Sequence, residues 1–207
     1  MSAPFGCVQT VRTSIMFEVM SANDHRIGIK RYLDLAPSPA LQAGLDAVFF
    51  DASSVKTFAS DSARAQFRER WLGRYLEHDP EFAFVAVSAS GDIAGYLAGA
   101  LDDPARCSRF SDIAYFADFK HLTQTFPAHL HVNLAASARN RGVGSALLQH
   151  FVDDARRAGA PGVHVVTSEG ARNASFYERN GFVQAGISGA APAARVFLAR
   201  SLTVSRA

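Results

Sequence analysis

A strand, a glycine-bearing turn, a helix and a second strand follow one another in the middle of the chain, and this order constrains the fold most. The apolar stretch 126–135 predicts the first strand, and residues 142–158 predict the helix, because apolar residues recur along one of its faces. Gly159 and Pro161 predict the end of that helix, and the valine-rich stretch 162–168 predicts the second strand. Two strands joined through a helix pair in parallel, so the sheet contains a parallel pair.

The rest of the chain indicates hairpin strands and helices around this crossover. Further strands are expected at 26–32, 81–88, 93–101, 182–187 and 194–202, and further helices at 37–50, 60–78 and 171–179. In the second of these helices, Phe67, Trp71 and Tyr75 recur at helical spacing, which we interpret as a core-facing stripe. The element order predicts an α/β protein with a mixed, mostly antiparallel central sheet flanked by helices.

Composition places the chain among ordinary globular proteins. Of its 207 residues, 48% are hydrophobic and 19% are charged, and the formal net charge is +2, so we expect no nucleic-acid partner. No apolar run approaches the ~20 residues of a membrane span, and the N-terminus lacks the pattern of a signal peptide, which favours a cytoplasmic protein without a membrane partner. Cys7 and Cys107 have neither disulfide-framework nor metal-ligand spacing.

Two stretches do not fit the regular pattern. Residues 1–15 show no period and are expected to form a loose arm, which leaves 16–207 as a single domain. Residues 102–127 are too long for a routine connection between strands and are rich in aromatic residues. This aromatic-rich insertion forms either a short helix packed over the sheet, or a wall for a substrate or for a second copy of the chain.

The turn before the central helix, RNRGVG at 139–144, has the composition of an anion-binding loop. The first turn of a helix presents unpaired N–H groups and the positive end of the helix dipole. Two glycines let an anion approach that backbone, and Arg139 and Arg141 add positive charge. The turn lacks the Gly-Lys-Ser/Thr of a Walker A loop, and Leu147 stands where a dinucleotide-binding loop has its third glycine. A plain surface turn is the alternative interpretation.

A second motif, NASFYERNGF at 173–182, follows the next strand and helps to decide which kind of anion-binding loop the turn forms. R-x-x-G-x-G after a strand, followed by N-x-x-x-Y-x-x-x-G-F, resembles the GNAT superfamily of acetyl-CoA-dependent N-acetyltransferases. The motifs lie within 126–185, and the order of helices and strands extends the resemblance over most of 26–202. The stretch FPAHLHVNL, with the aromatic residues before it, is also similar to the acetyltransferase-like domain of O-GlcNAcase and its relatives.

This resemblance implies where acetyl-CoA binds. In GNAT proteins the fourth and fifth strands of the sheet are parallel and splay apart, and the pantetheine arm lies in the gap against the backbone of the fourth strand. The residues that would contact acetyl-CoA are Val132, Leu134, Arg139, Asn140, Arg141, Gly142, Val143, Gly144, Ser145, Asn173 and Tyr177. The first two would pair with the arm, and residues 139–145 would hold the pyrophosphate. No metal ion is expected, because the histidines near the fourth strand lack a carboxylate or thiolate at a supporting spacing.

The resemblance also implies a general acid, and the residue pattern offers a base. Tyr177 occupies the position of the acid that protonates the leaving thiolate; the alternative is that it only packs under the cofactor. His131 is the best-placed base, because histidine titrates near neutrality, and it shares one strand face with His129 and Asn133. A structural role for His131, a base role for Glu169, or an ordered water in its place are the alternatives.

We therefore expect an acyltransferase that moves the acetyl group of acetyl-CoA directly to a small-molecule or peptide amine in a ternary complex. A non-catalytic acyl-CoA-binding or peptide-binding module is the alternative, which the lack of an unambiguous base favours. A nucleotide-dependent oxidoreductase is a third interpretation. The resemblance is compatible with a homodimer.

Overall fold

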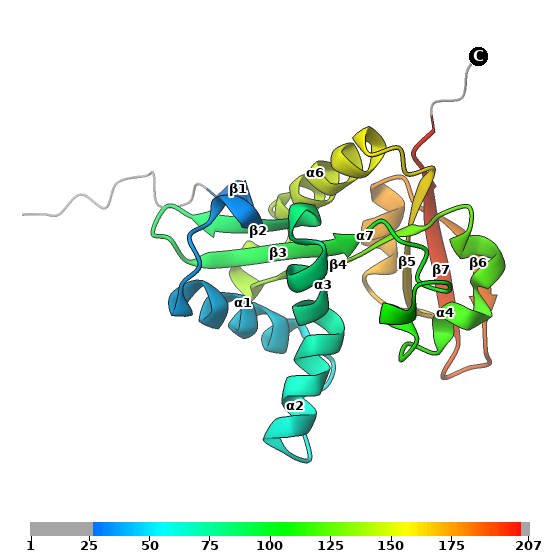
Figure 1. Ribbon diagram of the computed structural model, residues 1–207, viewed down its shortest axis with the longest axis horizontal. Helices are drawn as coiled ribbons and strands as arrows, with labels where there is room; N and C mark the ends of the chain where they lie inside the picture. Colours follow the sequence, from blue (N-terminus) through cyan, green and yellow to red (C-terminus); the bar gives the residue numbers. More distant parts are fainter. Residues whose placement is uncertain (1–26, 204–207) are drawn as a thin grey trace, which may run out of the picture.

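The computed structural model describes residues 27–203, so the arm expected at 1–15 lies outside the described residues. These residues form a seven-stranded sheet with the order β1-β2-β3-β4-β5-β7-β6 (Figure 1). The strands are β1 (Ile27–Arg31), β2 (Ala83–Ser88), β3 (Ile93–Ala100), β4 (Ala128–Leu134), β5 (Gly162–Ser168), β6 (Val183–Ser188) and β7 (Arg195–Ser201). Only β4 and β5 pair in parallel, which confirms the mixed, mostly antiparallel sheet expected from the sequence.

Helices cover both faces of the sheet. They are α1 (Pro39–Ala52), α2 (Asp61–Arg68), α3 (Arg74–His78), α4 (Tyr115–Asp118), α5 (Lys120–Thr123), α6 (Val143–Arg157) and α7 (Ala174–Arg179). The core on one face joins α6 and α7 to the strands, and a second core joins α1 and α3 to the opposite face. Each helix and strand predicted from residue 26 onward is present, with ends shifted by a few residues. No helix within residues 27–203 is both long and apolar enough to cross a membrane.

The start of α1 follows directly from its first residues. Ser38 Oγ accepts a hydrogen bond from the Leu41 N–H group at 3.1 Å, and Pro39 occupies the first helical position, where no N–H donor is needed. Leu41, Leu45 and Phe49 then face the core at helical spacing. This register directs the end of α1 toward the middle of the sheet, where β4 lies.

The long helix predicted at 60–78 is continuous but contains a π turn at Glu69–Gly73, between α2 and α3. The extra residue in this turn rotates the positions on either side of it relative to a regular helix. Tyr75 is fully buried, whereas Phe67 and Trp71 are half-buried. The predicted core-facing stripe is confirmed for Tyr75. Phe67 and Trp71 pack against the same core with one side and line the pocket described below with the other.

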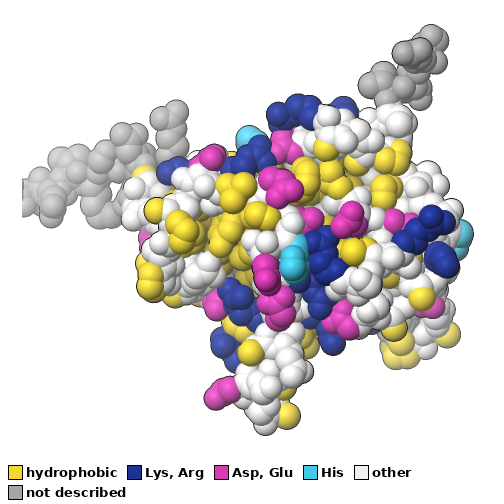
Figure 2. Space-filling view, in the orientation of Figure 1, with side chains coloured by type: hydrophobic (Ala, Val, Ile, Leu, Met, Phe, Trp, Pro, Cys, Tyr) yellow, Lys and Arg dark blue, Asp and Glu magenta, His cyan; other side chains and the backbone are white. Residues whose placement is uncertain are grey.

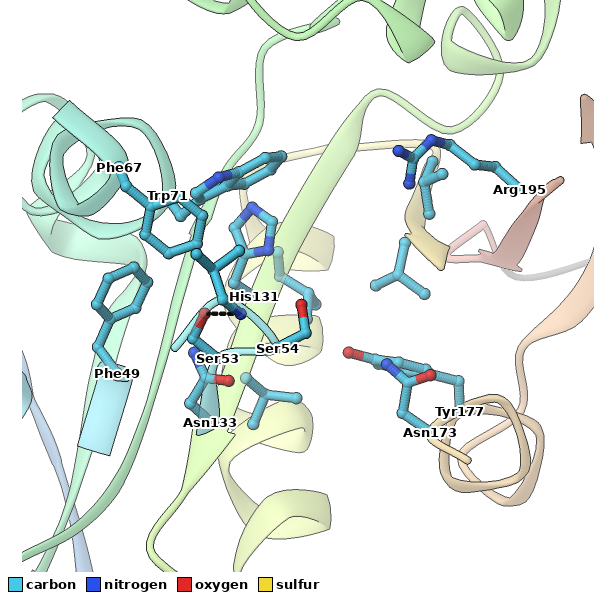
Figure 3. A pocket seen from close by; sticks show the side chains of 15 residues that line it. Phe49, Ser53, Ser54, Phe67, Trp71, His131, Asn133, Asn173, Tyr177 and Arg195 are labelled. Atoms are coloured by element: carbon cyan, nitrogen blue, oxygen red, sulfur yellow. Dashed lines mark hydrogen bonds between the residues drawn. The ribbon is translucent and has the colours of Figure 1, made fainter. Parts of the chain in front are cut away.

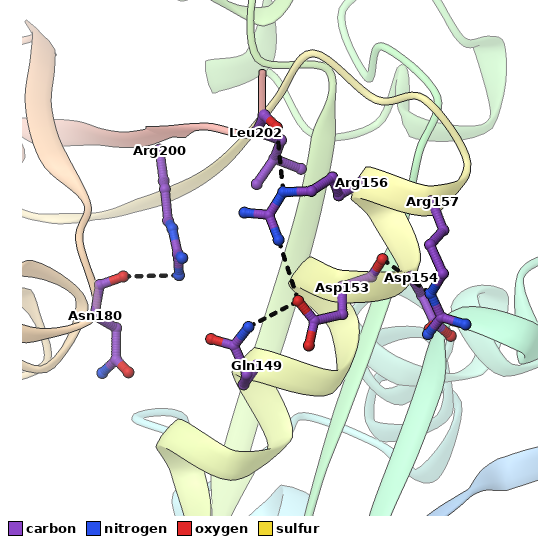
Figure 4. Close-up of polar contacts among 8 residues, drawn as sticks. All are labelled: Gln149, Asp153, Asp154, Arg156, Arg157, Asn180, Arg200 and Leu202. Atoms are coloured by element: carbon purple, nitrogen blue, oxygen red, sulfur yellow. Dashed lines mark hydrogen bonds and ion pairs between the residues drawn. The ribbon is translucent and has the colours of Figure 1, made fainter. Parts of the chain in front are cut away.

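The C-terminal end of α6 is tied to neighbouring elements by polar contacts (Figure 4). Arg156 Nε donates to the Leu202 carbonyl at 3.2 Å, and its guanidinium pairs with Asp153 at 3.1 Å. Arg200 of β7 donates to the Asn180 carbonyl at 3.0 Å, just after α7. These contacts hold α6 and α7 against β7, so the two helices have fixed positions beside β5.

The segment 102–127 packs over the sheet as short helical turns. Phe110, Phe116 and Phe119 are buried, and Phe119 contacts Phe197 of β7 with a ring separation of 5.2 Å. Tyr115 is only half-buried and stacks on Trp71. The segment therefore combines core packing with a side chain that reaches the neighbourhood of the pocket. On the face drawn in Figure 2, basic and acidic side chains are interspersed, without a continuous basic surface.

Candidate active site

The two middle strands of the sheet separate after a short parallel contact. β4 and β5 pair only at Ala128–Val163 and His129–His164, near the start of each strand. Beyond this contact, each strand stays paired with its antiparallel neighbour, β3 or β7. The splay expected between the fourth and fifth strands is therefore present.

Backbone groups from both strands are directed into this gap. The Ala135 N–H group donates to the Ala94 carbonyl of β3 at 3.0 Å, and hydrogen-bonded pairs alternate along an antiparallel ladder. The N–H and C=O groups of Val132 and Leu134 consequently face away from β3, toward β5. The same alternation between β5 and β7 directs the backbone of Val166 toward β4. An extended ligand in the gap therefore meets hydrogen-bonding groups, as an added strand would.

The loop before α6 and the first turn of this helix close one end of the gap. Gly142 has φ +78°, and a Cβ there would meet no atom within 4 Å, so this glycine serves the backbone conformation. A Cβ at Gly144 would lie 3.1 Å from Phe176 Cε2 and 3.3 Å from Leu134 Cδ1. The absence of a side chain at Gly144 therefore lets α6 pack closely against both α7 and β4. Residues 139–142 are exposed, so an anion can approach the start of α6 from solvent on this side.

The other loop residues surround this helix start. Arg139 Nε donates to the Leu134 carbonyl at 3.2 Å, and its guanidinium pairs with Asp51 at 3.3 Å. Asn140 also has a positive φ of 59°, and both Asn140 and Arg141 are exposed. Left-handed conformations at Asn140 and Gly142, on either side of Arg141, thus bring the chain from the end of β4 into α6.

Asn173 and Tyr177 form the wall of the gap beside β5, and both side chains point into the pocket (Figure 3). Tyr177 is 5% exposed, and its ring packs against Phe176 and Phe182 with centroid separations of 5.0 and 5.5 Å. This burial raises the pKa of Tyr177 above its ordinary value, so the hydroxyl group keeps its proton at neutral pH. Asn173 Oδ1 accepts a hydrogen bond from Thr167 Oγ1 at 2.8 Å.

His131 forms the facing wall, on the side of β4 that α3 covers. Its Nε2 lies 3.2 Å from the Tyr75 hydroxyl oxygen, and the Trp71 ring stands nearly perpendicular to the imidazole at 5.3 Å. Burial, with the nearby positive charge of Arg74 as a second cause, lowers the pKa of His131 to about 4. The imidazole is therefore neutral at pH 7.

These walls line a pocket of ≈ 420 Å³, to which residues between 49 and 71 and Arg195 also contribute. Those that sequence reasoning missed include Phe49, Ser53, Ser54, Phe67, Trp71 and Arg195. The first three could have been predicted from their position in the sequence, because they lie where α1 ends and the loop to α2 begins. Arg195 could not have been predicted in this way, because it lies at the pocket only as a result of the position of β7 next to β5 in the sheet.

Other predicted candidates lie elsewhere. Glu169 is exposed and lies outside the pocket lining, although it follows β5 directly. His129 is buried and does not line the pocket, and its ring stacks on that of His164 at 5.6 Å. Within residues 27–203, no three His, Cys, Asp or Glu side chains gather in the way a metal ion would require.

Comparison with known proteins agrees with this geometry. The sequence profile described as "Acetyltransferase (GNAT) family" matches residues 49–182. Similar solved structures are PH1933 from Pyrococcus horikoshii OT3 (15% identity, TM-score 0.65, 86% of this chain and 100% of that one) and a GCN5-related N-acetyltransferase from Kribbella flavida (21%, 0.57, 84% and 97%). A third is a chain of the NatC complex bound to Gag peptide and CoA (17%, 0.56, 86% and 99%). The narrower likeness to the O-GlcNAcase domain stays a prediction. The splayed strands, the glycine loop and the profile match agree, and this chain belongs to the acetyltransferase (GNAT) family.

Proposed function

We propose that this protein transfers the acetyl group of acetyl-CoA directly to the nitrogen of an amine while both substrates are bound. The observation that carries the proposal is the gap between β4 and β5, which ends at the start of α6 and has Tyr177 and His131 on its walls. Family membership supports acyl-CoA-dependent acetyl transfer in general. The peptide and CoA in the NatC structure are consistent with an amine acceptor.

In this proposal, acetyl-CoA lies along β4 with its phosphates at α6. The backbone groups of Val132 and Leu134 pair with the pantetheine arm. The pyrophosphate binds the first N–H groups of α6, from Gly142, Val143, Gly144 and Ser145, with Arg139, Asn140 and Arg141 around it. Since Arg139 already donates to the Leu134 carbonyl, its guanidinium shifts from that carbonyl when the arm binds.

The reaction needs an electrophile that is polarised, an acid and a base. The Val132 N–H group donates to the thioester carbonyl oxygen, where negative charge develops as the amine attacks. Tyr177 gives its proton to the departing thiolate. His131 accepts the proton of the attacking nitrogen. Because its pKa is about 4, His131 serves after the N–C bond has formed, when that nitrogen is most acidic, and does not deprotonate a free ammonium ion.

One observation favours a second function, an acyl-CoA-binding module without turnover. The low pKa of His131 makes its protonated form unfavourable, and Glu169 lies outside the pocket. A protein with this site and no effective base would bind acetyl-CoA and release no thiol.

Calorimetry with acetyl-CoA, combined with thiol release over a panel of amines, separates these functions. The proposed enzyme binds acetyl-CoA and releases CoA thiol only when an acceptor is added. Binding without release across the whole panel supports the module instead. An absence of binding at millimolar acetyl-CoA would refute both and would reopen the oxidoreductase interpretation, which NAD(H) binding tests directly.

A further inference from the structure

Arg195 brings a positive charge to the mouth of the pocket. It is the first residue of β7, and its guanidinium points toward the space between Trp71 and Tyr177 (Figure 3). The same side chain also lines an adjoining hollow of ≈ 320 Å³ that contains Trp71 and Tyr115. Arg195 therefore stands where a second substrate would pass on its way to the gap.

An aromatic ring contacts this guanidinium and belongs to a row of stacked rings. Arg195 Cζ lies 5.0 Å from the centroid of the Tyr115 ring, and Tyr115 stacks on Trp71 at 6.4 Å with an interplanar angle of 12°. Trp71 in turn meets the edge of His131. This row of rings connects the guanidinium to His131, and the cation–π contact with Tyr115 favours this position of the guanidinium before any ligand binds.

The charge of Arg195 differs from that of the arginines around it. Arg70 and Arg74 both pair with Asp112, at 2.8 and 2.7 Å. Among the described residues, no carboxylate forms an ion pair with Arg195. The other acid that lines the adjoining hollow is Asp118, which accepts a hydrogen bond from Ser188 Oγ at 3.0 Å.

The rest of the pocket lining is neutral. Within residues 27–203, its lining contains no Asp, Glu or Lys, and Arg195 is its single formal charge at pH 7. Phe49, Phe67 and Trp71 form an apolar wall opposite Tyr177. A polyamine or a lysine side chain with neighbouring cations finds no anion in such a pocket, whereas an acceptor that carries its own carboxylate finds a partner in Arg195.

We infer that the acceptor is an amino acid with an apolar side chain, whose carboxylate binds Arg195 and whose side chain contacts Phe49, Phe67 and Trp71. This inference rests on the proposed function and specifies its acceptor. The planar guanidinium suits two parallel hydrogen bonds to a carboxylate. Held this way, the α-nitrogen is adjacent to the carboxylate and is directed into the gap.

The group transfer balances without another reactant. The lone pair of the neutral α-amine forms the new N–C bond to the acetyl carbon, and the C–S bond breaks. One proton leaves the nitrogen and one joins the thiolate sulfur, so the products are an N-acetyl amino acid and CoA with a free thiol. The carboxylate is unchanged throughout and stays on Arg195.

Paired acceptors test this inference: L-phenylalanine, and L-phenylalaninamide, which lacks only the carboxylate charge. The wild-type protein should acetylate L-phenylalanine with the higher kcat/KM. Arg195→Gln should lower that kcat/KM by about 10- to 100-fold, the loss typical of a charge-assisted hydrogen-bonded pair, and leave the amide within about twofold. For L-phenylalanine, the kcat/KM of Arg195→Lys should lie between those of the wild type and Arg195→Gln, because lysine keeps the charge but lacks the planar guanidinium. Arg179→Gln, an exposed arginine of α7 outside the pocket, is the matched control.

The outcomes separate this inference from the function on which it rests. If acetyl-CoA binds and polyamines or lysine peptides are acetylated in preference to L-phenylalanine, the inference is overturned and the transferase remains. Equal loss for both acceptors in Arg195→Gln would also overturn it, because the charge would then serve the fold or the cofactor. Calorimetry on Arg195→Gln should give unchanged acetyl-CoA affinity. If acetyl-CoA does not bind to the wild-type protein, the proposed function and the inference both fail.

Discussion

Two replacements of Gly142, in the loop before α6, can distinguish the effect of this residue on stability from its effect on ligand binding. Gly142 has φ +78°, and its missing Cβ faces open space. Any new side chain therefore costs conformational energy without a clash inside the protein. In the proposed complex, the same open space is where the pyrophosphate approaches. Gly142→Ala and Gly142→Asn add side chains there that differ in how well they tolerate a left-handed backbone.

The magnitude follows from the conformation. A left-handed backbone costs an alanine roughly 1–2 kcal/mol, and the lower entropy of its unfolded chain offsets roughly 0.4–1 kcal/mol of that. Gly142→Ala should thus lower the free energy of unfolding by about 1 kcal/mol, which corresponds to about 2–4 °C in Tm for a domain of this size. Gly142→Asn should lose less, because asparagine tolerates this conformation, as Asn140 already does in the same loop at φ 59°.

Urea unfolding and calorimetric titration with CoA measure the two effects independently. Stability should follow the order glycine, asparagine, alanine, whereas CoA affinity should fall in both variants, since both place atoms in the phosphate path. An alanine variant as stable as wild type would refute the left-handed conformation. Full CoA affinity in both variants would refute the placement of the pyrophosphate at this helix start.

Three further measurements address the acid, a helix cap and the buried histidines. Tyr177→Phe should lower kcat by about 10²- to 10⁴-fold with little change in acetyl-CoA affinity, and a collapse of affinity would make Tyr177 a binding residue instead; Tyr32→Phe, in a turn before α1, is the control. Ser38→Ala should lower the free energy of unfolding by about 1 kcal/mol, because it removes the hydrogen bond to the Leu41 N–H group, and an unchanged urea midpoint would contradict this. Burial lowers the pKa of His164 to about 4, so the unfolded chain binds a proton at this histidine before the folded chain does. The free energy of unfolding should therefore fall from pH 6.5 toward pH 4, by about 1.4 kcal/mol per pH unit from this residue. His164→Gln should make the fall of the urea midpoint over that range less steep, and an unchanged slope would contradict this.

The sequence predicted the elements of this fold because their signals are local. Ser38 and Pro39 mark the start of α1, and Ser38 does cap it. The glycines and arginines at 139–144 mark the loop before α6. The alternation of side chains along β4 predicted that His131 and Val132 lie on opposite faces of the sheet, and the structure confirms this.

The pocket walls were not predictable in the same way, because they depend on contacts between distant segments. The position of Trp71 depends on the π turn, which leaves no mark in the apolar spacing on which the helix prediction relied. Arg195 reaches the pocket because β7 inserts between β5 and β6, and its guanidinium contacts the ring of Tyr115 in the segment 102–127. Neither this strand order nor the contact with Tyr115 can be inferred from the residues that neighbour Arg195 in the sequence.

In the proposed reaction, burial affects both groups that transfer protons, His131 and Tyr177. The pKa of His131 falls and that of Tyr177 rises because a poorly hydrated pocket disfavours the charged form of each group. The same surroundings disfavour the ammonium form of an acceptor, so the amine is bound in the neutral form that can attack. They also disfavour the departing thiolate, which makes its sulfur more basic. A tyrosine with a raised pKa is then still acid enough to protonate this thiolate, because the basicity of its partner has risen for the same reason.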